Sequence, residues 1–104
     1  MNLVSDKSRA IAEKHFPSKS AAVIDQLQDY CEYLSEFFSE ESQPETCERF
    51  CLAILKIAKT SNEKLNMAIE LGKTDYRDLL VSAGFGNSIT IHKDWASKTL
   101  NEKT

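Results

Sequence analysis

The chain has 104 residues, of which 41% are apolar and 28% are charged, and its net charge at pH 7 is −3. This composition suits one globular domain and excludes a disordered chain, while the negative charge argues against nucleic-acid binding, which needs a basic surface. Because the chain has only three Gly and two Pro, it favours a few long helices over many short strands.

The sequence also predicts a compartment. Residues 1–7 lack the apolar core of a signal peptide, and no apolar stretch approaches the roughly 18 residues that a membrane-spanning helix needs. The odd number of cysteines, Cys31, Cys47 and Cys51, predicts free thiols in a reducing environment. We therefore expect a cytoplasmic protein with no membrane partner.

The first two predicted helices cover residues 3–16 and 18–39. In the first, Ser5 is the candidate N-cap and Pro17 ends the helix. The second shows the clearest helical pattern, because apolar residues recur at intervals of three and four positions. These residues fall within an arc of roughly 140° and predict one buried face. They are Val23, Ile24, Leu27, Tyr30, Cys31, Leu34, Phe37 and Phe38.

Residues 44–59 form the predicted central helix. They contain the longest apolar run of the chain, from Phe50 to Leu55. A helix that is apolar nearly all round is usually buried, so we expect the other helices to surround this one. Ser42 and Glu45 have the spacing of a capping box, and Pro44 lies where a first-turn proline is tolerated.

Shorter helices are predicted in the C-terminal half. Thr60 and Glu63 repeat the capping-box spacing, and Gly72 is the predicted end of the helix that follows. The next helix covers residues 76–83, after Thr74 or Asp75 as the cap. It ends at Gly84, which is followed by Phe85 in the pattern of a left-handed helix end with a hydrophobic contact.

Residues 89–98 are ambiguous, because Ile89-Thr90-Ile91 is typical of a strand whereas Ser88 suits a helix cap; we predict a helix. Together these elements predict an all-α fold. We expect a small orthogonal or up-down bundle of five to six helices around the central helix. It forms a single domain over residues 1–104, with residues 99–104 as a frayed tail.

One segment carries a family resemblance. The stretch DYRDLLVSAGF at residues 75–85, followed by His92 and Trp95, resembles the C-terminal pattern of short uncharacterised bacterial proteins. The pattern covers about a fifth of the chain. The resemblance implies a bacterial, cytoplasmic and helical protein, and it implies no activity.

Acidic residues give the most informative polar pattern. Between Ser20 and Glu48 the chain has eight acids and no Lys or Arg. The acids recur at helical spacing on the side opposite the apolar face. We interpret this stripe as a docking surface for a basic protein, and the alternative is a solvated face balanced by neighbouring Lys and Arg. Tyr33 lies on its shoulder as a candidate anchor. The predicted partner-binding residues are Asp25, Asp29, Glu32, Tyr33 and Glu36.

Cysteines and histidines give the competing interpretation, a small enzyme or metal-binding protein. Cys47 and Cys51 lie one helical turn apart and could bind a metal if Cys31, His15 or His92 came near. No C-x₂-C motif is present, and free cysteine is usually buried. We therefore predict a non-enzymatic protein-interaction module, with no catalytic residue, cofactor or metal site and with an oligomeric state that the sequence leaves open.

Overall fold

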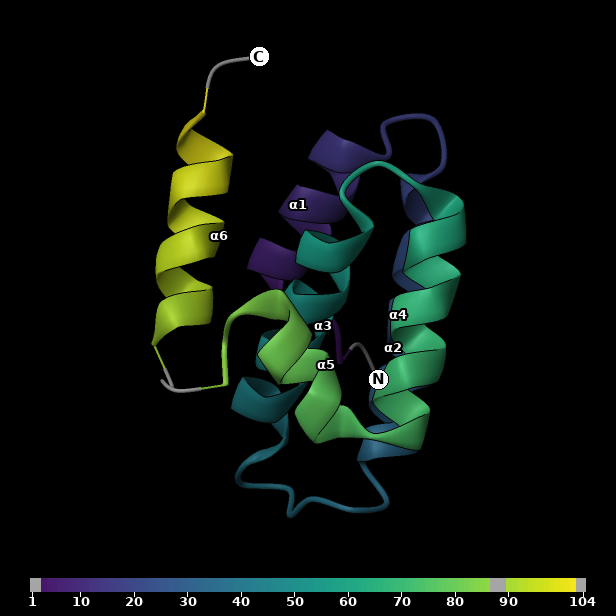
Figure 1. The fold of residues 1–104 in the computed structure, drawn as a ribbon, viewed down its shortest axis with the longest axis vertical. Helices are drawn as coiled ribbons and strands as arrows, with labels where there is room; N and C mark the ends of the chain where they lie inside the picture. The colour runs from purple at the N-terminus through teal and green to yellow at the C-terminus, as the bar shows by residue number, and fades with distance from the viewer. Residues whose placement is uncertain (1–2, 87–89, 103–104) are drawn as a thin grey trace.

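Six α-helices and no strand make up the described part of the chain in a computed structural model, which describes residues 3–86 and 90–102 (Figure 1). The predicted all-α fold is therefore confirmed. None of the described helices is both long and apolar enough to cross a membrane. The helices are α1 (Asp6–His15), α2 (Ser20–Leu34), α3 (Gln43–Ala58), α4 (Asn62–Thr74), α5 (Tyr76–Ala83) and α6 (Ile91–Asn101).

Helix α3 is the predicted central helix, and it contacts each of the other five (Figure 1). Every residue from Phe50 to Leu55 is buried, and Ile54 and Leu55 are completely so. Burying a side chain of this size removes roughly 1.5–3 kcal/mol of unfavourable hydration. The apolar run of α3 therefore explains why the remaining helices assemble around it.

Local signals at several helix ends act as predicted. The Ser5 side chain accepts a hydrogen bond from the Ser8 backbone N–H at 3.2 Å and caps α1. The Asp75 side chain caps α5 by accepting from the backbone N–H groups of Arg77 at 3.1 Å and Asp78 at 3.3 Å. Gly84 ends α5 in the left-handed conformation with φ of 82°, and the following Phe85 folds back and is fully buried.

Helix α2 is shorter than predicted, since it ends at Leu34 rather than near residue 39. The Ser35 hydroxyl donates to the Glu32 carbonyl at 2.6 Å, a local bond that competes with further helix. The Gln43 amide, from the start of α3, donates at 3.3 Å to the carbonyls of Ser35 and Phe38. Polar groups beyond the helix therefore take over the bonds that a longer α2 would make.

Both predicted capping boxes are wrong. The Ser42 hydroxyl donates to the Ser39 carbonyl at 3.1 Å and does not cap α3. Helix α4 is capped by Ser61, which accepts from the Lys64 N–H at 3.2 Å, so Thr60 is not the cap. In each case a neighbouring serine provides the hydrogen bond that replaces the predicted cap.

Gly72 does not end α4, because the helix continues to Thr74 and Gly72 is buried within it. A Cβ atom at this position would lie 2.4 Å from the Tyr30 hydroxyl oxygen and 2.8 Å from Tyr30 Cζ. The position therefore needs glycine to admit a neighbouring aromatic ring, not to stop the helix.

The C-terminal segment is helical from Ile91 to Asn101, so a helix near residues 89–98 is confirmed and fraying from residue 99 is wrong. The Lys14 ammonium donates to the backbone carbonyls of Thr99 and Glu102 and holds the end of α6 against α1. The predicted cap at Ser88 and residues 103–104 lie outside the described residues.

Candidate functional site

The acidic side chains of α2 project into solvent on the side opposite its buried face. Asp25, Asp29 and Glu32 are exposed, whereas Leu27 and Leu34 are buried. Glu36 is also exposed, but it lies beyond the end of α2 and so does not continue the helical row as predicted. Within the described residues, none of these carboxylates forms an ion pair; Glu45 does, with Lys93 at 3.5 Å.

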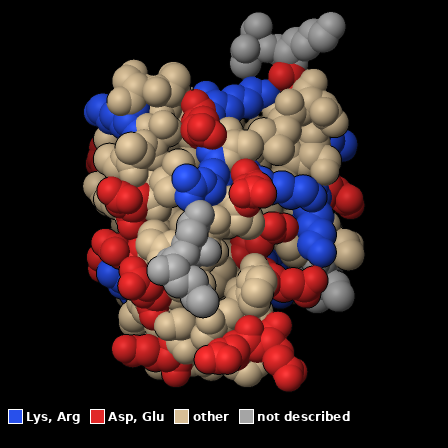
Figure 2. All heavy atoms as spheres, turned by 180° about the vertical axis from the view of Figure 1, so that it is seen from behind, with Lys and Arg blue, Asp and Glu red and all other residues tan. Residues whose placement is uncertain are grey.

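Acidic side chains also gather beyond α2. Figure 2 shows Asp and Glu clustered at the lower end of the molecule, where the connection from α2 to α3 lies in Figure 1. Glu36, Glu40 and Glu41 on this connection are all exposed. We call the exposed acids Asp25, Asp29, Glu32 and Glu36 the acidic face.

The two ends of the acidic face differ in their surroundings. Asp25 lines a shallow depression together with Arg9 and Glu13 of α1, so a cation lies near this end. Next to it, Gln26 donates to the Asn66 side chain of α4 at 2.9 Å. At the other end, near Glu32 and Glu36, the nearby cation comes from α4, because Lys73 lies beside Tyr33.

Tyr33 is half-buried and held in place at that end. Its hydroxyl donates to the Lys73 carbonyl of α4 at 3.0 Å. Its ring stacks on Tyr30 at 6.1 Å between ring centres and lies 5.1 Å from the ring of Phe37. The Lys73 ammonium lies 6.0 Å from the centre of the Tyr33 ring, so this ring already attracts a cation.

Beside Tyr33 lies a groove that the sequence did not predict, with a volume of about 430 Å³. Phe37 is 63% exposed, although the sequence placed it on a buried face, and Tyr76 is 40% exposed. Phe37 is exposed because α2 ends before it. We call this the aromatic groove. Its lining residues are Tyr33, Leu34, Phe37, Phe38, Gly72, Lys73, Thr74 and Tyr76.

The three cysteines meet in the core. Cys31 Sγ of α2 lies 3.4 Å from Cys51 Sγ of α3, and Cys31 also hydrogen-bonds Cys47. That bond and burial raise the pKa of Cys47. The bond to Cys47 lowers the pKa of Cys31, but the bond to Cys51 and burial outweigh it, so the pKa of Cys31 is also raised. All three are buried, and protonated thiols are poor nucleophiles and poor metal ligands.

The histidines join no such cluster. His92 is buried against the Phe85 ring, and within the described residues neither ring nitrogen has a hydrogen-bond partner. Burial lowers the pKa of both His92 and His15, so both are neutral at pH 7. No group of three or more His, Cys, Asp or Glu in the described ranges is arranged to hold a metal ion.

Comparison with known proteins adds no assignment. No family model, curated protein or solved structure matches this chain. The bacterial origin implied by the resemblance at residues 75–85 therefore stays a prediction, and any proposal about function rests on the geometry of the chain itself.

Proposed function

We propose that this protein is a non-enzymatic protein-interaction module whose acidic face, together with Tyr33 and the aromatic groove, docks a basic partner protein. The observation that carries this proposal is the position, at one end of α2, of carboxylates that form no ion pair with any described residue, beside exposed aromatic rings. In keeping with the sequence, we propose that it acts in a bacterial cytoplasm.

Repulsion between the carboxylates of the acidic face destabilises α2, and this supports a binding role for them. Asp25 and Asp29 are four residues apart on α2, and Asp29 and Glu32 are three apart. Like charges at these spacings destabilise a helix by about 0.2–0.5 kcal/mol per pair. Helix α2 carries no Lys or Arg to offset this repulsion. A basic partner would supply the missing positive charge.

The acidic face and the aromatic groove would act at different stages of binding. Surface charges mainly accelerate encounter with an oppositely charged partner. Buried aromatic contacts instead hold the complex together and slow its dissociation. Phe37 suits the second role, because its ring is exposed yet positioned by Tyr33. Glu32 and Glu36 flank Tyr33 in the sequence and suit the first.

The test uses a basic partner captured from the source cell and measures association and dissociation rates at several salt concentrations. Asp29→Asn/Glu32→Gln should slow association at least several-fold at low salt and flatten its salt dependence. The matched control is Glu63→Gln/Glu102→Gln, which removes two exposed carboxylates outside α2. If both pairs slow association equally, net charge rather than the acidic face sets the rate, and the proposal fails.

Phe37→Ser tests the groove separately. Since the ring is 63% exposed, its loss should leave the core intact. An anchor residue of this kind contributes at least about 2 kcal/mol, so dissociation should accelerate roughly 30-fold with little change in association. An unchanged dissociation rate would remove the aromatic groove from the proposal.

The meeting of the three thiols favours a second candidate, a small enzyme or metal-binding protein that uses cysteine. The sequence required Cys31, His15 or His92 to approach Cys47 and Cys51, and of these Cys31 does. Against this candidate stand the burial of all three and the raised pKa of Cys31 and Cys47. Metal analysis of purified protein, together with labelling by a thiol reagent, separates the two: stoichiometric zinc or fast labelling would favour the second candidate.

A further inference from the structure

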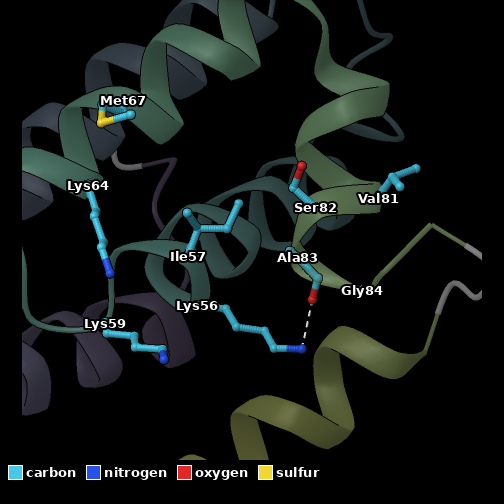
Figure 3. Close-up of a pocket in the computed structure, with 9 residues that line it drawn as sticks. All are labelled: Lys56, Ile57, Lys59, Lys64, Met67, Val81, Ser82, Ala83 and Gly84. Atoms are coloured by element: carbon cyan, nitrogen blue, oxygen red, sulfur yellow. Dashed lines mark hydrogen bonds between the residues drawn. The ribbon is translucent and has the colours of Figure 1, made fainter.

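A second groove lies between α3, α4 and α5, and its volume is about 640 Å³ (Figure 3). Met67 and Val81 line it and are 64% and 67% exposed, which makes them two of the five large apolar side chains exposed in the described residues. Figure 3 shows Met67 and Ile57 on one side of α5 and Val81 projecting from its other side. The groove therefore offers separate apolar side chains to solvent rather than one continuous strip.

Three lysines and no carboxylate line this second groove. The Lys56 ammonium is fixed, because it donates to the Ala83 carbonyl at 2.7 Å and lies 5.0 Å from the centre of the Phe85 ring. Lys59 and Lys64 lie on the same side as Met67 (Figure 3), and neither forms an ion pair within the described residues. We call this surface the lysine groove.

The backbone at Lys59 adds a further observation. Lys59 ends α3 with φ of 55° and ψ of −104°, and it is the one residue other than glycine with a positive φ in the described ranges. A residue with a side chain is strained in such a conformation, which favours glycine. This strained turn places a lysine on the rim of the groove.

We propose that the lysine groove binds an acidic amphipathic segment of another protein. Apolar side chains of that segment would pack against the lining residues Met67, Ile57 and Val81. Its Asp or Glu side chains would pair with Lys59 and Lys64. We choose an acidic segment as the occupant because the charged residues that line the groove are all positive. The methionine suits a variable apolar contact because its side chain is unbranched and adaptable.

Other occupants fit the groove less well. A free inorganic anion would leave the exposed Met67 and Val81 without a role. A second copy of this chain could offer its acidic face, and self-association is therefore measured in the same experiment. The surface differs in position and in sign from the acidic face, so this inference does not depend on the proposed function.

The probe is a fluorescent helical peptide that carries Leu and Glu on adjacent stripes, compared with a scrambled peptide of the same composition. Binding is followed by anisotropy, and amide chemical shifts of the labelled protein report the site. We expect the patterned peptide to shift residues 56–67 and 81–84 and the scrambled peptide to bind at least tenfold more weakly. Binding elsewhere, or equal binding of both peptides, would overturn the proposal.

Lys59→Gln/Lys64→Gln should weaken binding of the patterned peptide about tenfold, because it removes both lysines that would pair with the carboxylates of the peptide. Met67→Gln/Val81→Gln should weaken it by a similar factor, and both pairs change exposed side chains that the core does not need. The matched control is Lys7→Gln/Lys98→Gln, which removes two exposed lysines outside the groove. An equal loss in the control would show that the overall charge of the protein, rather than the groove, sets the affinity, and would overturn the proposal.

Sedimentation of the protein without peptide tests the second copy. A monomer at low salt supports a different protein as the occupant. Self-association that Lys59→Gln/Lys64→Gln abolishes would instead show that another copy of this chain fills the groove, and the proposal as stated would be wrong.

Discussion

Replacing Gly72 with alanine changes both helix propensity and packing, and these two effects predict opposite changes in the free energy of unfolding. Alanine is favoured over glycine inside a helix by about 1 kcal/mol. However, the new Cβ would lie 2.4 Å from the Tyr30 hydroxyl oxygen and 3.0 Å from Leu79 Cδ2. Both neighbouring side chains are fully buried and cannot move into solvent. Overpacking of this kind costs about 1–3 kcal/mol.

Because the contacts involve two buried side chains, we place the packing penalty for Gly72→Ala near the top of that range. The expected net loss in free energy of unfolding is then about 2 kcal/mol. For a domain of this size, such a loss lowers the melting temperature by roughly 8–16 °C. Urea and thermal denaturation, followed by circular dichroism, measure both quantities.

Tyr30→Phe provides the internal control. Within the described residues, the buried Tyr30 hydroxyl has no hydrogen-bond partner, and burial raises its pKa. Removing such a group should stabilise the protein by about 1 kcal/mol. It also removes the closest contact of the methyl group that Gly72→Ala introduces, so the double variant should recover about 1 kcal/mol beyond additivity. If Gly72→Ala stabilises the protein, or if the two effects add, the proposed contact is wrong.

Three further predictions use the same measurements. Ile54→Ala should lower the free energy of unfolding by about 2–5 kcal/mol because Ile54 is fully buried in α3, and a loss well short of that range would contradict its central position. Lys59→Gly should raise the free energy of unfolding by about 1 kcal/mol, because glycine adopts the positive φ of this position without strain. A decrease in the free energy of unfolding would mean that no strain is present. Burial lowers the pKa of His92 below its ordinary 6.5, so the unfolded chain binds the proton more tightly and stability falls as the pH drops below about 6.5. His92→Phe should reduce that fall on acidification from neutral pH, and an unchanged pH profile would contradict the assignment.

The parts of the fold that the sequence predicted well depend on neighbouring residues. The apolar run from Phe50 to Leu55 could be accommodated only in a buried helix, so α3 was identifiable without any contact information. Asp75 and Gly84 act on backbone groups within a few positions of themselves. Such effects are present in any short window of sequence, and their outcome does not depend on distant elements.

The wrong predictions concern contacts between distant residues. Gly72 has the sequence context of a helix end, but its role is to accommodate Tyr30, which lies 42 positions earlier (72 − 30). The end of α2 depends on hydrogen bonds from Gln43. The meeting of Cys31 with Cys51 depends on how α2 packs against α3. Periodicity cannot supply these facts, because each is set by tertiary packing.

The candidate site also combines features that the sequence predicted with features that depend on tertiary packing. Exposure of Asp29 and Glu32 follows from the helical period, because the residues half a turn away must face the core. The aromatic groove does not follow, since it arises where α2 stops and leaves Phe37 outside the helix. A longer α2 would have turned Phe37 toward the core and removed the groove. The charge pattern and the candidate anchor Tyr33 were therefore visible in the sequence, whereas the exposure of Phe37 was not.

The opposite signs of the acidic face and the lysine groove give a test of whether either acts locally. Asp29→Asn/Glu32→Gln changes the net charge from −3 to −1, whereas Lys59→Gln/Lys64→Gln changes it to −5. If the overall field attracted or repelled an acidic peptide, the first pair would strengthen its binding about as much as the second weakens it. Screening at physiological salt acts over about 8 Å, so local contacts dominate there. Binding of a peptide in the lysine groove should then be weakened by Lys59→Gln/Lys64→Gln and unchanged by Asp29→Asn/Glu32→Gln. Binding of a basic partner should show the reverse.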